Sequence, residues 1–290
     1  MIRIGFPRNL TRTPDRRPTR IAYALPTAFT AGNMFLGFIA VMRAFEGSLA
    51  GMGTAASAAH FSVAAQCIGW AMILDGLDGR IARMTNTTSD FGKEMDSMSD
   101  VITFGIAPAV LAFAWGVYTV DSLGLPMLRE QILRVGTFGC FLFLACGSAR
   151  LARFNITNNP VPRNPGRPDR KYFVGLPIPA AASLVAAVIY STDGYPLRFW
   201  PLVIGWIVLM SGLGLLMVST WRYRSFKDLN LNRPRSPLLF VFLASLIFLV
   251  WNYSHAVLLT IAVLYVGSGV LVRVAGILNR VFRKPEVAVN

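Results

Sequence analysis

The sequence predicts an all-α integral membrane protein with about eight transmembrane helices. Of its 290 residues, 54% are hydrophobic and only 14% are charged, and the mean hydropathy is +0.52. A soluble globular domain carries about 25% charged residues. Apolar stretches of roughly 20 residues, the length that crosses a bilayer, recur between short polar segments.

The apolar stretches can be placed in order along the chain. The first follows a basic, proline-broken arm at 1–22, and a basic tail at 278–290 follows the last, so 23–277 forms one transmembrane catalytic domain. The fifth begins with a Gly-Leu-Pro-Ile-Pro sequence, which breaks the start of its helix. Only residues 251–255 divide the last two, so the number eight depends on that short segment. The expected spans are 23–42, 60–83, 98–119, 132–153, 174–191, 200–219, 237–252 and 255–277.

The net charge of +14 indicates topology. Of the 28 lysines and arginines, all but Arg43, Arg129, Arg134 and Arg198 lie in the termini or in one alternating set of loops. Cytoplasmic loops are rich in Lys and Arg, so we expect both termini and the acidic motif described next on the cytoplasmic side of the inner membrane. The basic residues also suit anionic membrane lipids. No basic module interleaved with aromatics is present, so no nucleic-acid partner is expected.

Four aspartates occupy a region where membrane proteins rarely carry acids. They are Asp75, Asp78, Asp96 and Asp100. Carboxylates at a bilayer are costly and indicate function, and four of them together demand cations. Oxygen ligands without a nearby His or Cys suit Mg²⁺ or Mn²⁺ rather than zinc. Bridging carboxylates favour two ions about 3.5 to 4 Å apart.

Small residues share the helix faces of these acids. A helix over 60–83 places Gly79 and Ala82 beside the first two aspartates, and Gly92 precedes the other two at a spacing of four residues. Small residues let a bulky ligand approach the helix backbone. The pattern therefore favours a ligand site over a simple ion site.

Two other interpretations stay open at this point. The acids could pair with Arg80 and Arg83 and serve packing only, although two arginines cannot neutralise four aspartates. They could also form a proton or cation relay in a transporter. Relay acids are usually spread through the depth of the membrane, whereas these gather at one interface.

The spacing Asp-x2-Asp-Gly-x2-Ala-Arg-x8-Gly-x3-Asp-x3-Asp resembles the signature of the CDP-alcohol phosphotransferases. All fixed positions of the signature are filled, by Asp75, Asp78, Gly79, Ala82, Arg83, Gly92, Asp96 and Asp100. The resemblance implies a six-helix core, a CDP-linked lipid and two divalent ions, Mg²⁺ or Mn²⁺, held by the four aspartates. It also implies a homodimer.

Other segments resemble the bacterial membrane-type phosphatidylserine synthases of this family, over most of the chain from Leu25 to about residue 235. They are 25–40, 145–157, 171–182 and 217–229. This resemblance implies transfer of the phosphatidyl group of CDP-diacylglycerol to L-serine, with release of CMP. The alternatives are another acceptor, such as glycerol 3-phosphate, inositol phosphate or choline, or a cation-coupled transporter.

The sequence departs from that subfamily in two places. Met95, Met98 and Ser99 stand where Leu, Leu and Ala are commoner, and the loop 158–170 is longer and richer in proline. The difference in the loop leaves the shape of this loop open, and it does not affect the expected reaction.

The resemblance also implies roles for individual residues. Asp100 is the expected general base for the serine hydroxyl. The expected contacts to CDP-diacylglycerol are Thr30, Asn33, Gly79, Ala82, Arg83 and Gly92. Thr30 and Asn33 could instead form hydrogen bonds between helices.

Serine carries a carboxylate, which an arginine fork suits. The expected serine-binding residues are Arg150, Arg153, Asn155 and Lys171. The basic members of this set are equally consistent with contacts to lipid headgroups.

Overall fold

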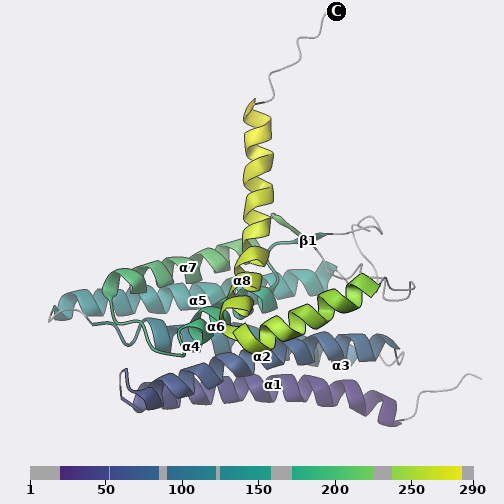
Figure 1. Cartoon of the computed structure of the whole chain (residues 1–290), viewed down its shortest axis with the longest axis horizontal. Coiled ribbons are helices and arrows are strands. Elements are labelled where there is room, and N and C mark those ends of the chain that lie inside the picture. Colours follow the sequence, from purple (N-terminus) through teal and green to yellow (C-terminus); the bar gives the residue numbers. More distant parts are fainter. Residues whose placement is uncertain are drawn as a thin grey trace, which may run out of the picture.

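The computed structural model is a bundle of long helices. It describes residues 20–51, 53–84, 90–121, 125–157, 172–224 and 237–282. The long helices α1 (Arg20–Leu49), α2 (Ala55–Met84), α5 (Pro126–Thr157) and α7 (Trp200–Val218) run along the long axis of the molecule (Figure 1). Helix α1 packs on α2 and α5 packs on α7. The predicted all-α membrane architecture is therefore confirmed.

The third span is continuous but changes its winding. Helix α3 (Asp90–Asp100) continues into a π-helix, η1 (Val101–Ile106), and then into α4 (Ala107–Gly116). Together they form one candidate span over Phe91–Gly116. A third span is thus present, but it begins seven residues before the predicted 98–119, so that Asp96 and Asp100 lie within it, and the structure adds the π-helix.

Six helical segments of the described chain are long and apolar enough to cross a membrane. They are Thr27–Leu49, Ala55–Ile81, Phe91–Gly116, Pro126–Ile156, Trp200–Val218 and Ile247–Ala275. The short apolar helix α6 (Ile178–Ser191) has only 14 residues, and it begins after Pro177, as the predicted helix break requires. The expected count of eight is not confirmed.

The last two predicted helices meet at a kink. Helix α8 (Pro237–Phe282) covers both, and its backbone angles are non-helical at Tyr253 (φ −133°, ψ 41°), within the predicted divide at 251–255. Figure 1 shows the two halves pointing in different directions, and the C-terminal half, in yellow, extends away from the other helices. Only one candidate span, Ile247–Ala275, falls on this element, and it runs across the kink.

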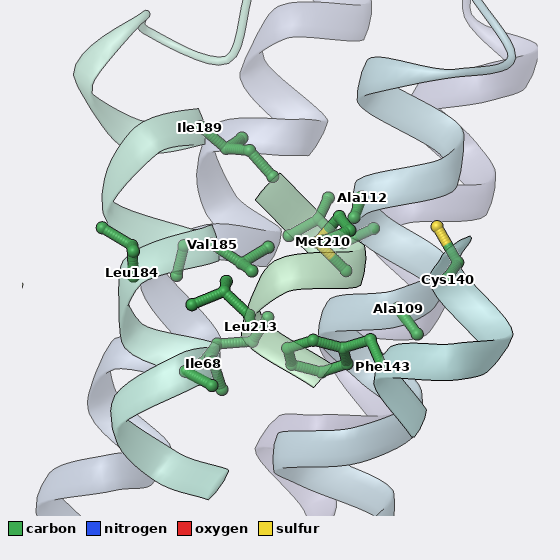
Figure 2. Close-up of a cluster of buried hydrophobic side chains, with 14 of the residues drawn as sticks. Ile68, Ala109, Ala112, Cys140, Phe143, Leu184, Val185, Ile189, Met210 and Leu213 are labelled. Atoms are coloured by element: carbon green, nitrogen blue, oxygen red, sulfur yellow. The ribbon is translucent and has the colours of Figure 1, made fainter. Parts of the chain in front are cut away.

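Apolar side chains from five helices meet in the centre of the bundle. Figure 2 shows them converging: Ile68 of α2, Ala109 and Ala112 of α4, Cys140 and Phe143 of α5, Leu184, Val185 and Ile189 of α6, and Met210 and Leu213 of α7. Other large apolar side chains, such as Phe35, Trp70 and Val208, are exposed on the outside of the bundle. A helix that is apolar all round is typical of a membrane span.

A small antiparallel sheet closes one end of the bundle. Strand β1 (Tyr172–Val174) pairs with β2 (Arg222–Arg224), so that Phe173 stands opposite Tyr223. The backbone N–H of Gly175 donates to the carbonyl of Trp221 at 2.8 Å, and that of Leu176 to the carbonyl of Leu216 at 3.1 Å. This sheet ties the start of α6 to the end of α7.

Candidate metal and substrate site

Three of the four predicted metal-ligating aspartates come together between α2 and α3. Asp75 of α2 and Asp96 and Asp100 of α3 each present a carboxylate oxygen, and these oxygens lie within 4.8 Å of one another. All three side chains are partly buried. The backbone of Asp78 continues the same helix one turn later, and its side chain lies outside the described residues.

The donor set fits a hard divalent cation. Three carboxylates within 4.8 Å repel one another when ionised, and a divalent ion relieves that repulsion. Carboxylate oxygens are ligands that Mg²⁺ and Mn²⁺ accept. The cluster is thus compatible with metal binding.

Hydroxyl groups anchor the acidic helix to α1. Ser99 Oγ donates to the carbonyl of Thr30 at 3.3 Å, and Thr103 Oγ1 donates to the carbonyl of Asn33 at 3.1 Å. Ser99 and Thr103 are fully buried. Ser99, the departure from the subfamily pattern, therefore helps to fix the direction in which Asp96 and Asp100 point.

The π-helix packs tightly against α1 at Gly37. A Cβ on Gly37 of α1 would stand 2.8 Å from the Cα of Thr103, so only glycine fits this contact. The π-helix begins directly after Asp100. Such short π segments are frequent at functional sites. The sequence reasoning missed η1, and no local sequence signal announces it.

Thr30 and Asn33 reach the third span through their carbonyl groups. Both residues are buried, with exposed fractions of 6% and 0%. Neither the oxygen nor the nitrogen of the Asn33 side-chain amide has a hydrogen-bond partner among the described residues. A buried amide left unpaired costs about 1–3 kcal/mol, so this group calls for a ligand.

The helix face beside the first two acids is open. A Cβ built on Gly79 would meet no described atom within 4 Å outside its own helix. Gly92 is partly buried on α3. The side chains of Ala82 and Arg83 lie outside the described residues.

The predicted serine-binding residues occupy different environments. Arg150 of α5 is 8% exposed and lies close enough to Asp100 for their charges to interact. Arg153 is exposed, and its guanidinium donates to the carbonyl of Val218 at 3.5 Å, at the end of α7. Asn155 donates from Nδ2 to Ser97 Oγ of α3 at 2.8 Å. Lys171 lies outside the described residues.

The predicted serine-binding residues that the structure describes thus differ in their surroundings: one is a buried arginine, and the other two connect helices. Arg150 is close enough to Asp100 for their charges to interact, whereas Arg153 and Asn155 connect α5 to α7 and α3. Sequence spacing alone places Arg150 and Arg153 on one helix face and does not distinguish their surroundings.

The chain is similar to known proteins over most of its length. Residues 23–218 match the family model described as CDP-alcohol phosphatidyltransferase. The chain is 37% identical over 234 residues to a CDP-diacylglycerol–serine O-phosphatidyltransferase of Helicobacter pylori, which covers 80% of this chain and 84% of the relative.

Two more distant relatives carry related names. One is a CDP-diacylglycerol–serine O-phosphatidyltransferase of Bacillus subtilis, 32% identical over 70% of this chain and 91% of the relative. The other is an archaetidylserine synthase of Methanothermobacter thermautotrophicus, 31% identical over 69% of each chain. The family-model match over residues 23–218 includes the segment that holds the aspartates.

Proposed function

The chain belongs to the CDP-alcohol phosphatidyltransferase family, and on that premise we propose that it transfers the phosphatidyl group of CDP-diacylglycerol to L-serine. The products are phosphatidylserine and CMP. The observation that carries the proposal is the convergence of Asp75, Asp96 and Asp100 beside the buried Arg150. A phosphoryl-transfer site and a cation suited to an amino-acid carboxylate thus adjoin each other.

The aspartates are proposed to hold two divalent ions, Mg²⁺ or Mn²⁺, with Asp78 as the fourth ligand. Such ions, when bound, neutralise the pyrophosphate and the charge that develops on the departing CMP. Asp75, Asp96 and Asp100 gather at the junction of α2 and α3, where ions could engage a phosphate on the open Gly79 face.

The donor is proposed to lie along α1 and α2. The amide of Asn33 would form hydrogen bonds with the nucleotide or phosphate, together with Thr30. Gly79, Ala82 and Gly92 would leave room for the nucleotide against the helices, and Arg83 would lie near it. The unpaired Asn33 amide and the open space beside Gly79 support this placement.

The chemical step is proposed as a direct displacement at phosphorus. The serine oxygen bonds to the phosphorus that carries diacylglycerol, the bond from that phosphorus to the CMP oxygen breaks, and Asp100 accepts the hydroxyl proton. Asp100 is partly buried at the end of α3, and its fixed helix limits the positions its carboxylate can take. Positioning and charge stabilisation supply most of the catalysis in reactions of this kind.

The serine is proposed to bind through its carboxylate to Arg150. Arg153, Asn155 and Lys171 complete the basic end of the pocket, with Arg153 and Asn155 also tethering α5 to its neighbours. A planar guanidinium donates two parallel hydrogen bonds to a carboxylate, a contact that a simple alcohol cannot receive.

The protein is a multi-pass membrane protein. We also propose that it resides in the inner membrane, that both termini and the aspartate site face the cytoplasm, and that it forms a homodimer. The distribution of Lys and Arg supports the orientation.

An acceptor assay tests the function. Purified protein given labelled CDP-diacylglycerol should release CMP with serine, and much less with glycerol 3-phosphate, inositol phosphate or choline. Chelation of divalent ions should abolish the release, and adding Mn²⁺ or Mg²⁺ should restore it, because the carboxylate cluster cannot hold a pyrophosphate unaided. A preferred acceptor other than serine would reassign the substrate, and gradient-driven ion uptake into liposomes without CMP release would favour a transporter.

Loss of the buried guanidinium should weaken serine binding selectively. Arg150→Met is expected to raise the KM for serine roughly 10- to 100-fold, because hydrogen bonds to a charged group are lost, while the KM for CDP-diacylglycerol changes little. Arg150→Lys keeps the charge, so its KM for serine should lie between that of the unmodified protein and that of Arg150→Met.

The matched control for this experiment is Arg134→Met. Arg134 is an exposed arginine of the same helix, paired with Glu130. If the Arg150→Met and Arg134→Met variants have equal KM values for serine, Arg150 does not bind the acceptor.

A further inference from the structure

Tyr223 of strand β2 is a buried polar residue with no role in the site described so far. Its side chain is fully buried, and its hydroxyl has no hydrogen-bond partner in the described part of the chain. Buried hydroxyls are nearly always paired, so this hydroxyl is available to a ligand or a water molecule. A phenylalanine would fill the same space without this cost.

The position of Tyr223 is set by the sheet and by α8. Strand pairing places its backbone opposite that of Phe173. Its ring packs on Gly269 of α8, where an added Cβ would overlap with Cε1 and Cζ of the ring. The ring of Tyr265, one helical turn before Gly269, lies 6.1 Å from that of Tyr223. The hydroxyl position is therefore fixed by both the sheet and α8.

Tyr223 lies in the same region as Arg150 and the acidic cluster. Its ring is 6.1 Å from that of Tyr265, Tyr265 is close enough to Arg150 for their charges to interact, and Arg150 is close enough to Asp100 for the same. The Nε of Arg150 also has no hydrogen-bond partner among the residues that the structure describes. This region therefore holds two buried donors, one from α5 and one from β2, that have no partner among the described residues.

The hydroxyl of Tyr223 is a proton donor at neutral pH. Burial, and after it the neighbouring Tyr265, raises the pKa of Tyr223 above its usual value. The proton therefore stays on the oxygen. A carboxylate offers only acceptor sites, so a guanidinium and a phenol hydroxyl are both suitable partners for it.

We propose that Tyr223 and Tyr265 form the wall of the acceptor pocket opposite Arg150, and that Tyr223 donates a hydrogen bond to the carboxylate of an amino-acid acceptor. This inference rests on the proposed function and adds two residues to it. It makes β2 and α8 parts of the acceptor site, although neither carries a residue of the aspartate signature. Discrimination between serine and an amino alcohol that lacks the carboxylate would depend on Tyr223.

The test compares Tyr223→Phe with the unmodified enzyme, using serine and ethanolamine as acceptors. The variant should raise the KM for serine about tenfold, as expected for a lost hydrogen bond to a charged group. The KM for CDP-diacylglycerol should stay within about twofold. The preference for serine over ethanolamine should fall by the same factor as the serine KM rises, which a general loss of stability would not produce.

Two further variants make the result decisive. Tyr190→Phe is the matched control, because its hydroxyl already bonds to Ser254 at 3.1 Å and it lies at the far end of α6. It should leave the serine KM unchanged. Gly269→Ala should displace the Tyr223 ring and reproduce the effect of Tyr223→Phe.

The possible outcomes test this inference and the proposed function separately. If the unmodified protein uses serine while Tyr223→Phe retains the normal KM and the normal preference, the tyrosine wall is wrong and the function stands. If the unmodified protein does not form a product with serine, the proposed function itself fails.

Discussion

Replacing Asp100 by asparagine is expected to lower turnover by a factor of about 10³ or more. A general base contributes about 10² to 10⁴ to a rate, and the change also removes one of the three gathered carboxylates. Asparagine has nearly the same shape, so the fold should persist. CMP release by purified protein, measured at saturating CDP-diacylglycerol, serine and divalent ion, gives the result.

The control for this experiment is Asp121→Asn. Asp121 is an exposed acid near Arg198, in the connection after α4. It should retain nearly normal turnover. Near-normal turnover in the Asp100 variant would exclude Asp100 as the base. A loss that disappears when the divalent ion is raised would instead assign Asp100 to metal binding alone.

Replacing Gly175 by alanine is expected to destabilise the protein by about 3 kcal/mol. Gly175 has φ +80°, a conformation that other residues rarely adopt. An added Cβ would overlap with the carbonyl oxygen of Met217 and stand 3.1 Å from that of Ser219, and backbone atoms cannot move aside cheaply. The midpoint of thermal unfolding in detergent should fall by several degrees.

Gly205→Ala provides the comparison for Gly175. Gly205 lies within α7, and a Cβ there would meet no described atom within 4 Å outside its helix. Alanine has the higher helix propensity, so this change should be neutral or stabilising. Equal midpoints for the two variants would show that the tight contact between Gly175 and the end of α7 does not matter for stability.

Much of the site could be predicted because its information is local. Asp75 and Asp96 lie on neighbouring helices, and periodicity alone places each acid on a common face with its small residues. The convergence of Asp75, Asp96 and Asp100 follows from those faces and a short connection between the helices.

The features that the sequence does not predict depend on contacts between segments far apart in the chain. Ser99 bonds to Thr30, and Tyr223 packs on Gly269, and neither pair is visible in a sequence pattern. The strands β1 and β2 have three residues each, which is too short for an alternation of apolar and polar residues to reveal them. Two helices, α6 and α7, also separate them along the chain.

The π-helix η1 also determines which changes in chain length the site could tolerate. A π turn holds about one residue more than the α-helical turn it replaces. Deleting one residue from Val101–Ile106 could convert the turn to α-helix without breaking the span. Asp96 and Asp100 would then keep about the same angle relative to α4, because each kind of turn completes one revolution. A single-codon deletion in the α-helical part of α3 or α4 would instead rotate one side of the span by about 100° against the other and turn the acids away from Asp75.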